Sequence, residues 1–184
     1  MNILPTPLEG CFIIEPRIFG DERGYFFESF NQAKFKELTG DDTVFVQDNQ
    51  SYSTKGVLRG LHFQTGQSAQ AKLVRVVKGE VLDVAVDLRA GSKTYGKHFS
   101  LEISEKNNLQ LFIPKGFAHG FVVLSDDAIF QYKCDNYYDK AAEGGIHYAD
   151  PYLNIDWILP KDKLIVSGKD LELPYLAKAG DFSF

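Results

Sequence analysis

The sequence lacks the short motifs by which many enzymes hold a cofactor. It contains no Cys-x-x-Cys, His-Glu-x-x-His, Gly-x-Gly-x-x-Gly or Gly-x-x-x-x-Gly-Lys-Ser/Thr pattern, and these patterns are typical of zinc sites, dinucleotide sites and P-loops. We therefore expect neither redox-cofactor nor ATP chemistry. The only two cysteines, Cys11 and Cys134, are far apart, which favours reduced thiols over a disulfide framework.

Long apolar runs and a net positive charge are missing as well. No apolar run approaches the roughly 18 residues of a membrane-spanning helix. Residues 1–8 show no basic stretch followed by an apolar one, so we expect a cytoplasmic protein without a signal peptide or a membrane partner. The net charge of −5 argues against general nucleic-acid binding. A phosphate ligand is compatible with it, because local arginines bind phosphate whatever the overall charge.

What the sequence does contain favours an all-β protein. Hydrophobic residues make up 44% of the 184 residues, with 15 Phe, 9 Tyr, 16 Gly and 7 Pro. This predicts one domain over residues 1–184, with a sizeable core, short strands and tight turns. The strand-like segments are residues 10–18, 25–30, 56–64, 73–77, 80–88, 97–103, 108–113, 120–124 and 128–136. Strands at this spacing indicate an antiparallel sandwich or barrel.

Few helices are expected. Asn31 can cap, and Gly40 can end, the only helix predicted before residue 150. Residues 150–184 are expected to pack against the barrel as short helices or irregular structure. Within the strand at residues 80–88, alternation places Asp83 and Asp87 on one face, which should be solvated or functional.

The most informative stretch is GVLRGLHFQ, which follows a polar segment at residues 47–51. It sets Arg59 and His62 three residues apart in an apolar run, and Lys72 follows ten residues after His62. A histidine that titrates near neutrality beside a fixed cation suits removal of a proton from carbon and stabilisation of the enolate that results. The alternative is a core histidine satisfied by hydrogen bonds, and His62 taken alone favours that alternative.

Two arginines are candidates for binding an anion, and a metal is not expected. Arg59 lies in an apolar strand, where an unpaired charge is costly, so it is expected to meet an anion. Arg23 lies near glycines and beside aromatic residues that could stack on a base or a sugar. The segment PKGFAH, ending at His119, is similar to part of the second metal motif of cupins. The first motif would need His-x-His, whereas this chain has only His62 there.

Taken together, these segments resemble the dTDP-4-dehydrorhamnose 3,5-epimerase family over nearly the whole chain. The motifs, in order, are FGDERGYFFE (19–28), QDNQSYS (47–53), GVLRGLHFQ (56–64), AQAKLVRVVKGEVLDVAVDLR (69–89), IPKGFAHGFVVLS (113–125), YKCDNYY (132–138), EGGIHYADP (143–151) and SGKD (167–170). The resemblance implies a dimeric, cupin-like jelly-roll barrel that needs neither metal nor organic cofactor. It also implies an isomerase that inverts C3 and C5 of dTDP-4-dehydro-6-deoxy-D-glucose, giving dTDP-4-dehydro-L-rhamnose for bacterial surface polysaccharides.

The resemblance also implies roles for individual residues. His62 matches the catalytic base, and Asp170 matches the carboxylate that orients it. Lys72 matches a lysine beside the sugar oxygens, and Tyr132 matches the proton donor, with Tyr138 as the alternative donor. The expected substrate contacts are Arg23, Glu28, Gln47, Asp48, Asn49, Arg59, His119, Tyr138, Glu143 and Lys169.

Some alternatives stay open. The loop at residues 65–68 lacks a proline that many relatives carry, and His98 replaces a common tryptophan; both departures concern loop rigidity rather than chemistry. The nearest rival function is an epimerase of a related dTDP-4-keto-6-deoxy sugar that inverts only C3 or only C5. A more remote rival is a cupin that binds a sugar nucleotide without catalysis.

The aromatic strand within residues 19–28 predicts a partner. Such a strand is a liability at a sheet edge unless another sheet covers it. We therefore expect a two-fold homodimer whose N-terminal strands are swapped, so that Arg23 and Glu28 reach the partner's site. The alternative is that this segment closes its own barrel and that Arg23 acts within its own chain.

Overall fold

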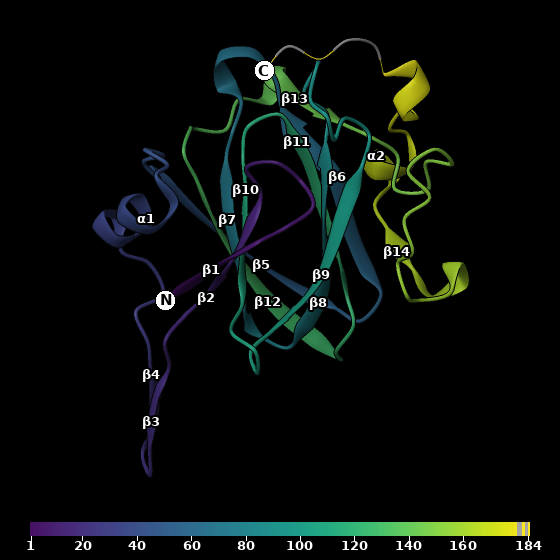
Figure 1. Ribbon diagram of the computed structural model, residues 1–184. Helices are drawn as coiled ribbons and strands as arrows, with labels where there is room; N and C mark the ends of the chain where they lie inside the picture. Colours follow the sequence, from purple (N-terminus) through teal and green to yellow (C-terminus); the bar gives the residue numbers. More distant parts are fainter. Residues whose placement is uncertain (180–181, 183) are drawn as a thin grey trace.

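The computed structural model describes residues 1–179, 182 and 184, and it consists mainly of two facing β-sheets (Figure 1). The strand order of the first sheet is β1 (Asn2–Pro5), β2 (Phe12–Glu15), β10 (Gln110–Ile113), β7 (Lys72–Lys78), β12 (Asp127–Cys134) and β5 (Gln47–Thr54). That of the second sheet is β13 (Glu143–Gly145), β6 (Val57–Gln64), β11 (Phe117–Val123), β8 (Glu80–Asp87) and β9 (His98–Ser104). These neighbours pair antiparallel, so the predicted all-β barrel is confirmed.

Apolar side chains from both sheets fill most of the space between them. Phe121 of β11 and Phe130 of β12 stack with their ring centroids 4.2 Å apart, and Val74, Val81 and Ala85 are fully buried in the same cluster. Burying one large apolar side chain contributes about 1.5–3 kcal/mol. The burial also fixes the register, because a slip of one residue would turn every inward side chain outward.

Helix α1 (Gln32–Thr39) covers the outer face of the first sheet. Phe35 is its buried residue and packs with Leu73 and Phe112 of the sheet. The helix begins at Asn31, whose side chain accepts the N–H of Lys34, and it ends at Gly40, which has a φ of 70°. The predicted helix and both of its end residues are therefore confirmed.

The C-terminal segment covers the outer face of the second sheet. Leu153, Trp157 and Leu176 pack there against residues of β8 and β11. The segment contains η3 (Lys161–Lys163), β14 (Ile165–Val166), α2 (Gly168–Leu171) and η4 (Leu176–Lys178), which confirms the expected short helices. Strand β14 was not anticipated, and it pairs parallel with β6. Among the residues that the structure describes, every helix is too short or too polar to span a bilayer.

Two segments differ from what the sequence analysis described. The polar segment at residues 47–51, which was not counted among the strand-like segments, is the first part of β5, where alternate residues face the interior. The face of β8 that carries Asp83 and Asp87 was expected to be solvated or functional, and the first alternative is wrong because both side chains are fully buried. Asp83 pairs with His119, and the carboxylate of Asp87 accepts hydrogen bonds from the Arg89 guanidinium and nearby hydroxyls.

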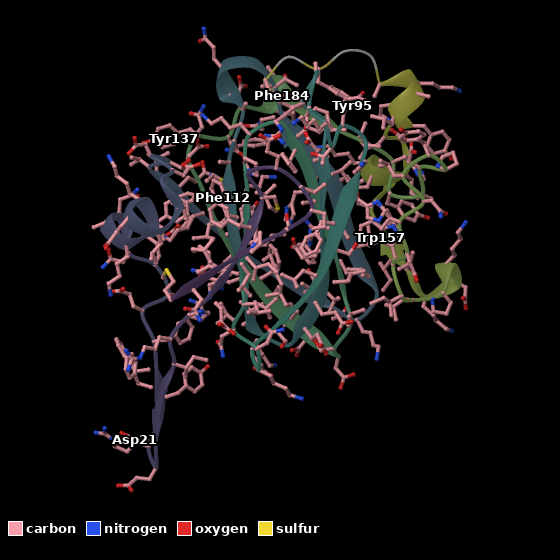
Figure 2. All side chains as sticks on the ribbon, in the orientation of Figure 1. Asp21, Tyr95, Phe112, Tyr137, Trp157 and Phe184 are labelled. Atoms are coloured by element: carbon pink, nitrogen blue, oxygen red, sulfur yellow. The ribbon has the colours of Figure 1, made fainter. Side chains whose placement is uncertain are left out.

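Residues 19–26 form a separate hairpin. Strands β3 (Phe19–Asp21) and β4 (Gly24–Phe26) pair only with each other. The hairpin projects from the barrel as an arm, with Asp21 near its tip (Figures 1 and 2). Tyr25 is 60% exposed and Phe26 is 70% exposed, so the arm leaves aromatic surface uncovered within one chain.

Candidate active site

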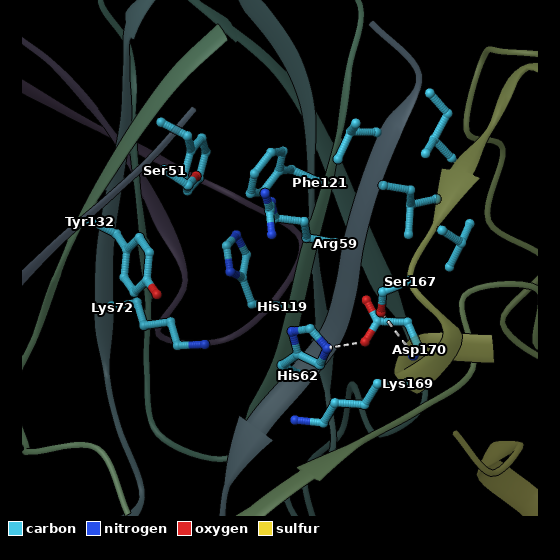
Figure 3. Close-up of a pocket in the computed structure, with 15 residues that line it drawn as sticks. Ser51, Arg59, His62, Lys72, His119, Phe121, Tyr132, Ser167, Lys169 and Asp170 are labelled. Carbon is cyan, nitrogen blue, oxygen red and sulfur yellow. Dashed lines mark hydrogen bonds and ion pairs between the residues drawn. The ribbon is translucent and has the colours of Figure 1, made fainter. Parts of the chain in front are cut away.

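A cavity of about 540 Å³ lies between the two sheets (Figure 3). His62, Lys72 and Tyr132 line it, and the same three side chains border a second cavity of about 370 Å³. β6 supplies His62, whereas β7 and β12 of the opposite sheet supply Lys72 and Tyr132. Three of the four residues predicted to be catalytic therefore meet at the junction of two adjoining cavities.

His62 and Asp170 form a close pair. The Nε2 atom of His62 lies 2.7 Å from Oδ1 of Asp170, and the second ring nitrogen lies on the cavity side in Figure 3. The other oxygen of Asp170 accepts the N–H of Gly60 at 3.2 Å. Burial raises the pKa of Asp170, but the hydrogen bond with His62, the charge of His62 and the hydrogen bonds with the Gly60 N–H and Ser167 outweigh burial and leave the pKa below its usual value. Asp170 therefore stays ionised and holds the imidazole.

A short helix delivers Asp170 to this position. Asp170 lies in α2, which has four residues, and Ser167 precedes the helix as its cap. The hydroxyl of Ser167 accepts the N–H of Asp170 at 3.1 Å. The neighbouring strand β14 pairs with β6, so the helix is anchored to the strand that carries His62.

Lys72 and Tyr132 face His62 from the first sheet (Figure 3). Burial lowers the pKa of Lys72 and raises the pKa of Tyr132. Neither the ammonium group nor the phenol hydroxyl hydrogen-bonds to a side chain drawn in Figure 3. The amino group of Lys72 and the protonated hydroxyl of Tyr132 thus stand opposite the imidazole, with their hydrogen-bonding capacity unused by those neighbours.

Arg59 and His119 line the main cavity on the side of the second sheet. The Nε atom of Arg59 donates to the hydroxyl of Ser53 at 3.1 Å. Arg59 is exposed to the cavity rather than enclosed among apolar side chains, and the expectation that it meets an anion stays a prediction. His119 is buried, and its Nε2 atom lies 2.8 Å from Oδ2 of Asp83.

Tyr138, Glu143 and Lys169 form a polar rim beside the catalytic pair. The hydroxyl of Tyr138 donates to Glu143 at 2.9 Å, and the ammonium of Lys169 lies 2.7 Å from the other oxygen of Glu143. The hydrogen bond from Lys169 lowers the pKa of Glu143, and the hydrogen bond to Glu143 raises the pKa of Tyr138. Gln47 and Asn49 of β5 line the second cavity next to this rim.

Three of the predicted contact residues do not line either cavity within one chain. Asp48 is exposed on the other side of β5, where it pairs with Lys133 at 2.8 Å. Arg23 lies on the exposed arm and pairs with Asp21. Glu28 follows the arm and pairs with Lys34 at 2.7 Å. Arg23 and Glu28 therefore lie away from both cavities of their own chain.

Comparison with known proteins decides the family. The family model described as dTDP-4-dehydrorhamnose 3,5-epimerase matches residues 5–178 of this chain. The chain belongs to the dTDP-4-dehydrorhamnose 3,5-epimerase family. It is therefore an isomerase, and more narrowly an epimerase.

Close relatives of the epimerase are found in sequence and in structure. The dTDP-4-dehydrorhamnose 3,5-epimerase of Shigella flexneri is 54% identical over 171 residues, which are 93% of this chain and 93% of that protein. The crystal structure of the enzyme from Elizabethkingia anophelis NUHP1 superimposes with a TM-score of 0.94 at 54% identity, covering 98% of this chain and 99% of that one. The enzyme from Legionella pneumophila Philadelphia 1, in complex with dTDP-4-keto-L-rhamnose, gives a TM-score of 0.93 at 51% identity, covering 97% of this chain and 94% of that one.

Some residues of the epimerase site escaped the sequence analysis. Ser167 has a detectable signal, because a serine three residues before an acidic residue is a frequent helix start. Alternation within β8 singled out Asp83, but its pairing with His119 requires the tertiary structure. Gln64 gave no signal, and it lies buried beside the second cavity. Among the described residues, no group of three or more His, Cys, Asp or Glu side chains could hold a metal ion.

Proposed function

We propose that the epimerase inverts C3 and C5 of dTDP-4-dehydro-6-deoxy-D-glucose to give dTDP-4-dehydro-L-rhamnose. The observation that carries this proposal is the opposition of two walls of one cavity. The second sheet presents His62, held by Asp170, while the first sheet presents Lys72 and Tyr132. A base on one face of a sugar ring and an acid on the other are what stereochemical inversion requires.

The substrate makes the first step accessible. The hydrogens on C3 and C5 both neighbour the C4 ketone, so loss of either leaves an enolate. His62 removes the proton through its cavity-side nitrogen, and the ionised Asp170 stabilises the imidazolium that forms. Lys72 is the cation that holds the enolate oxygen. Because loss and return of a proton leave the oxidation state of the sugar unchanged, no redox partner is needed.

Tyr132 is the proposed proton donor to the opposite face. Burial raises the pKa of Tyr132, so its hydroxyl stays protonated, and Figure 3 draws no hydrogen bond from it. The hydroxyl of Tyr138, the alternative donor, is already donated to Glu143. Tyr132 is therefore the better placed of the two tyrosines, and Tyr138 is assigned to substrate binding.

The remaining contacts belong to the nucleotide and the sugar. Arg59 and His119 offer nitrogen donors inside the main cavity, which suits a diphosphate. Gln47, Asn49, Glu143 and Lys169 lie around the second cavity and its rim. Asp48 stays in the proposal as a contact near the edge strand, although its carboxylate points away from the cavity.

A homodimer with swapped N-terminal arms is part of the proposal. The exposed aromatic side chains of the arm and the outward position of Arg23 and Glu28 support it. We further propose one domain over residues 1–184 and a cytoplasmic location. Burial raises the pKa of Cys11 to about 12 and that of Cys134 to about 11, and both thiols are unpaired, as suits a reducing compartment.

The second candidate is an epimerase that acts at only one carbon of a related dTDP-4-keto-6-deoxy sugar. It would use the same base and the same acid, so the number of centres inverted separates the two candidates. A protein that only binds the sugar nucleotide is disfavoured, because the His62–Asp170 pair and the raised pKa of Tyr132 serve proton transfer.

Proton NMR of the product formed in D2O tests the proposal. Deuterium should enter at both C3 and C5 in the wild type, and His62→Ala should abolish exchange at both by several powers of ten, as loss of an essential group does. His98→Ala, which removes a histidine on β9 outside the cavities, is the matched control. Deuterium at one carbon alone would establish the second candidate.

Dialysis against a chelator should leave exchange unchanged, and a loss restored by a divalent ion would contradict the cofactor-free mechanism.

A further inference from the structure

The rim beside the active site is held in place mainly by hydrogen bonds. Tyr137 is 67% exposed and Tyr138 is 55% exposed, so burial contributes little to fixing the loop that follows β12. Three amide side chains grip its backbone instead. Gln47 accepts the N–H of Tyr138 at 3.1 Å, and Gln70 donates to the carbonyl of Asn136 at 2.8 Å. The third amide side chain belongs to Gln64.

Gln64 makes the most complete of these contacts. Its Nε2 atom donates to the carbonyl of Asp139, and its Oε1 atom accepts the N–H of the same residue at 3.0 Å. One primary amide thus satisfies both polar groups of one backbone residue, as a neighbouring strand would. Gln64 is only 5% exposed, so water has little access to compete for these two hydrogen bonds.

Gln64 also connects the catalytic strand to the rim. It is the last residue of β6, two residues after His62, and it lies directly opposite Glu143 in the pairing of β6 with β13. Asp139, which it grips, follows Tyr138, and the hydroxyl of Tyr138 donates to Glu143. Glu143 in turn pairs with Lys169, the neighbour of Asp170. The contacts run from the strand of the base, through the rim, to the helix that orients the base.

We propose that Gln64 is a positioning residue that fixes the Tyr138 rim relative to His62 and thereby sets how tightly the epimerase holds its sugar nucleotide. The inference rests on the proposed function, since it concerns the same site. Gln64 does not take part in proton transfer, because its amide is fully engaged with Asp139. Its effect passes through Tyr138 and Glu143, which meet the substrate equally in the ground state and in the transition state. A change in KM with an unchanged kcat is the signature of that role.

The test compares Gln64→Met with Asn107→Leu. Met keeps the length of Gln but loses both hydrogen bonds. Asn107 also grips backbone N–H and C=O groups, those of Ser104 and Glu102, but it lies in the turn between β9 and β10, outside both cavities. Gln64→Met should increase hydrogen–deuterium exchange of residues 136–142 and raise KM about tenfold while kcat stays within about twofold. Asn107→Leu should change neither exchange at residues 136–142 nor KM.

A double-mutant cycle identifies the route of the effect. In a Tyr138→Phe background, Gln64→Met should raise KM by less than about twofold, because the two changes disrupt one set of contacts. Gln64→Leu, which also loses both hydrogen bonds and introduces no charge, should raise KM to a similar extent. That second variant decides the question if Gln64→Met does not fold.

Several results would overturn the assignment. Unchanged exchange at residues 136–142 would show that Gln64 does not hold the rim, and increased exchange with an unchanged KM would show that the rim does not affect binding. An equal rise of KM in Asn107→Leu would indicate general destabilisation. A wild type that exchanges neither sugar proton would defeat the proposed function instead. The dissociation constant of dTDP, measured by calorimetry for the same variants, would then decide the role of Gln64.

Discussion

At the scale of single residues, burial in the cavity disfavours the charged form of Lys72. Burial lowers the pKa of Lys72 although no acidic side chain drawn in Figure 3 pairs with it. An unpaired cation in such a place destabilises the folded state, and proteins tolerate this where the charge serves the reaction. Lys72 is therefore expected to increase activity at the expense of stability.

Lys72→Met should abolish exchange at both carbons and raise the free energy of unfolding by about 1 kcal/mol, measured by urea denaturation at pH 8. Because the native pKa is lowered from 10.5, the unfolded wild type binds more protons in the window between the two values. The free energy of unfolding of the wild type should therefore rise with pH in that window and level off above it. The variant should lack this rise.

Lys78→Met is the control for Lys72→Met. Lys78 lies on the same strand but is exposed and pairs with Asp127 at 2.8 Å. Losing an exposed pair costs at most about 1 kcal/mol, so this variant should be no more stable than the wild type and should keep full activity. A loss of stability in Lys72→Met would mean that the ammonium is stabilised in the folded protein.

Tyr132→Phe should separate proton removal from inversion. His62 should still wash the substrate protons into D2O, because its base function does not need the phenol, but inverted product should fall about a hundredfold or more, as loss of a general acid does. NMR of residual substrate and of product measures the two quantities in one sample. If both fall together, Tyr132 shapes the cavity instead, and Tyr138 becomes the candidate donor.

At the scale of elements, the short helix α2 decides the position of the Asp170 carboxylate. Helix α2 has only four residues, so its own backbone hydrogen bonds are too few to stabilise it. Its start depends on the hydroxyl of Ser167, and its place depends on the pairing of β14 with β6. The alignment of Asp170 with His62 thus depends on the Ser167 cap and on a short strand pairing.

Ser167→Ala should lower kcat about three- to tenfold, because loss of a helix cap costs about 1 kcal/mol and loosens Asp170. Ser104→Ala is the matched control, since the hydroxyl of Ser104 also accepts an N–H three residues ahead, that of Asn107, outside both cavities. It should destabilise the protein similarly and leave kcat unchanged. Ser167→Thr should restore activity. An unchanged kcat in Ser167→Ala would show that packing alone positions Asp170.

At the scale of the whole molecule, the arm is the part that one chain leaves incomplete. Its strands pair with neither sheet, and its aromatic side chains are exposed (Figure 2). Arg23 and Glu28 lie on or beside it, away from both cavities. A symmetric dimer would cover each arm and bring Arg23 to the partner's phosphates.

Mixed dimers of Arg23→Ala and His62→Ala test the exchange of arms. Each variant alone should be nearly inactive. If the arms are swapped, one of the two sites in the mixed dimer has both residues intact, so about half of the wild-type activity per dimer should return. Co-expression with two affinity tags isolates the mixed dimer, and exchange in D2O measures its activity. A mixed dimer that stays inactive would show that Arg23 serves its own chain.

Much of the fold could be predicted from the sequence, because it depends on local patterns. Apolar alternation and turn residues located most strands, and Asn31 and Gly40 marked the ends of α1, since caps are recognised by residue type. The segment at residues 47–51 was not recognised as a strand because its inward side chains are polar. They are polar because they face a cavity, and a sequence pattern does not distinguish a polar interior from solvent.

The candidate site divides in the same way. The sequence by itself identified His62, Lys72 and Tyr132 as candidates for the chemistry. Each lies in a short continuous motif, and such a motif can be recognised without knowledge of the fold. The tertiary structure shows how these residues meet: Asp170, which the family resemblance matched to the carboxylate beside the base, reaches His62 across 108 residues, and Gln64, which the sequence analysis did not single out, grips Asp139 across 75. It also decided that Arg23 and Glu28 lie outside the cavities of their own chain. The physical reason is that contacts between distant residues depend on how the two sheets and the arm pack, whereas local periodicity specifies only which face of a strand each residue occupies.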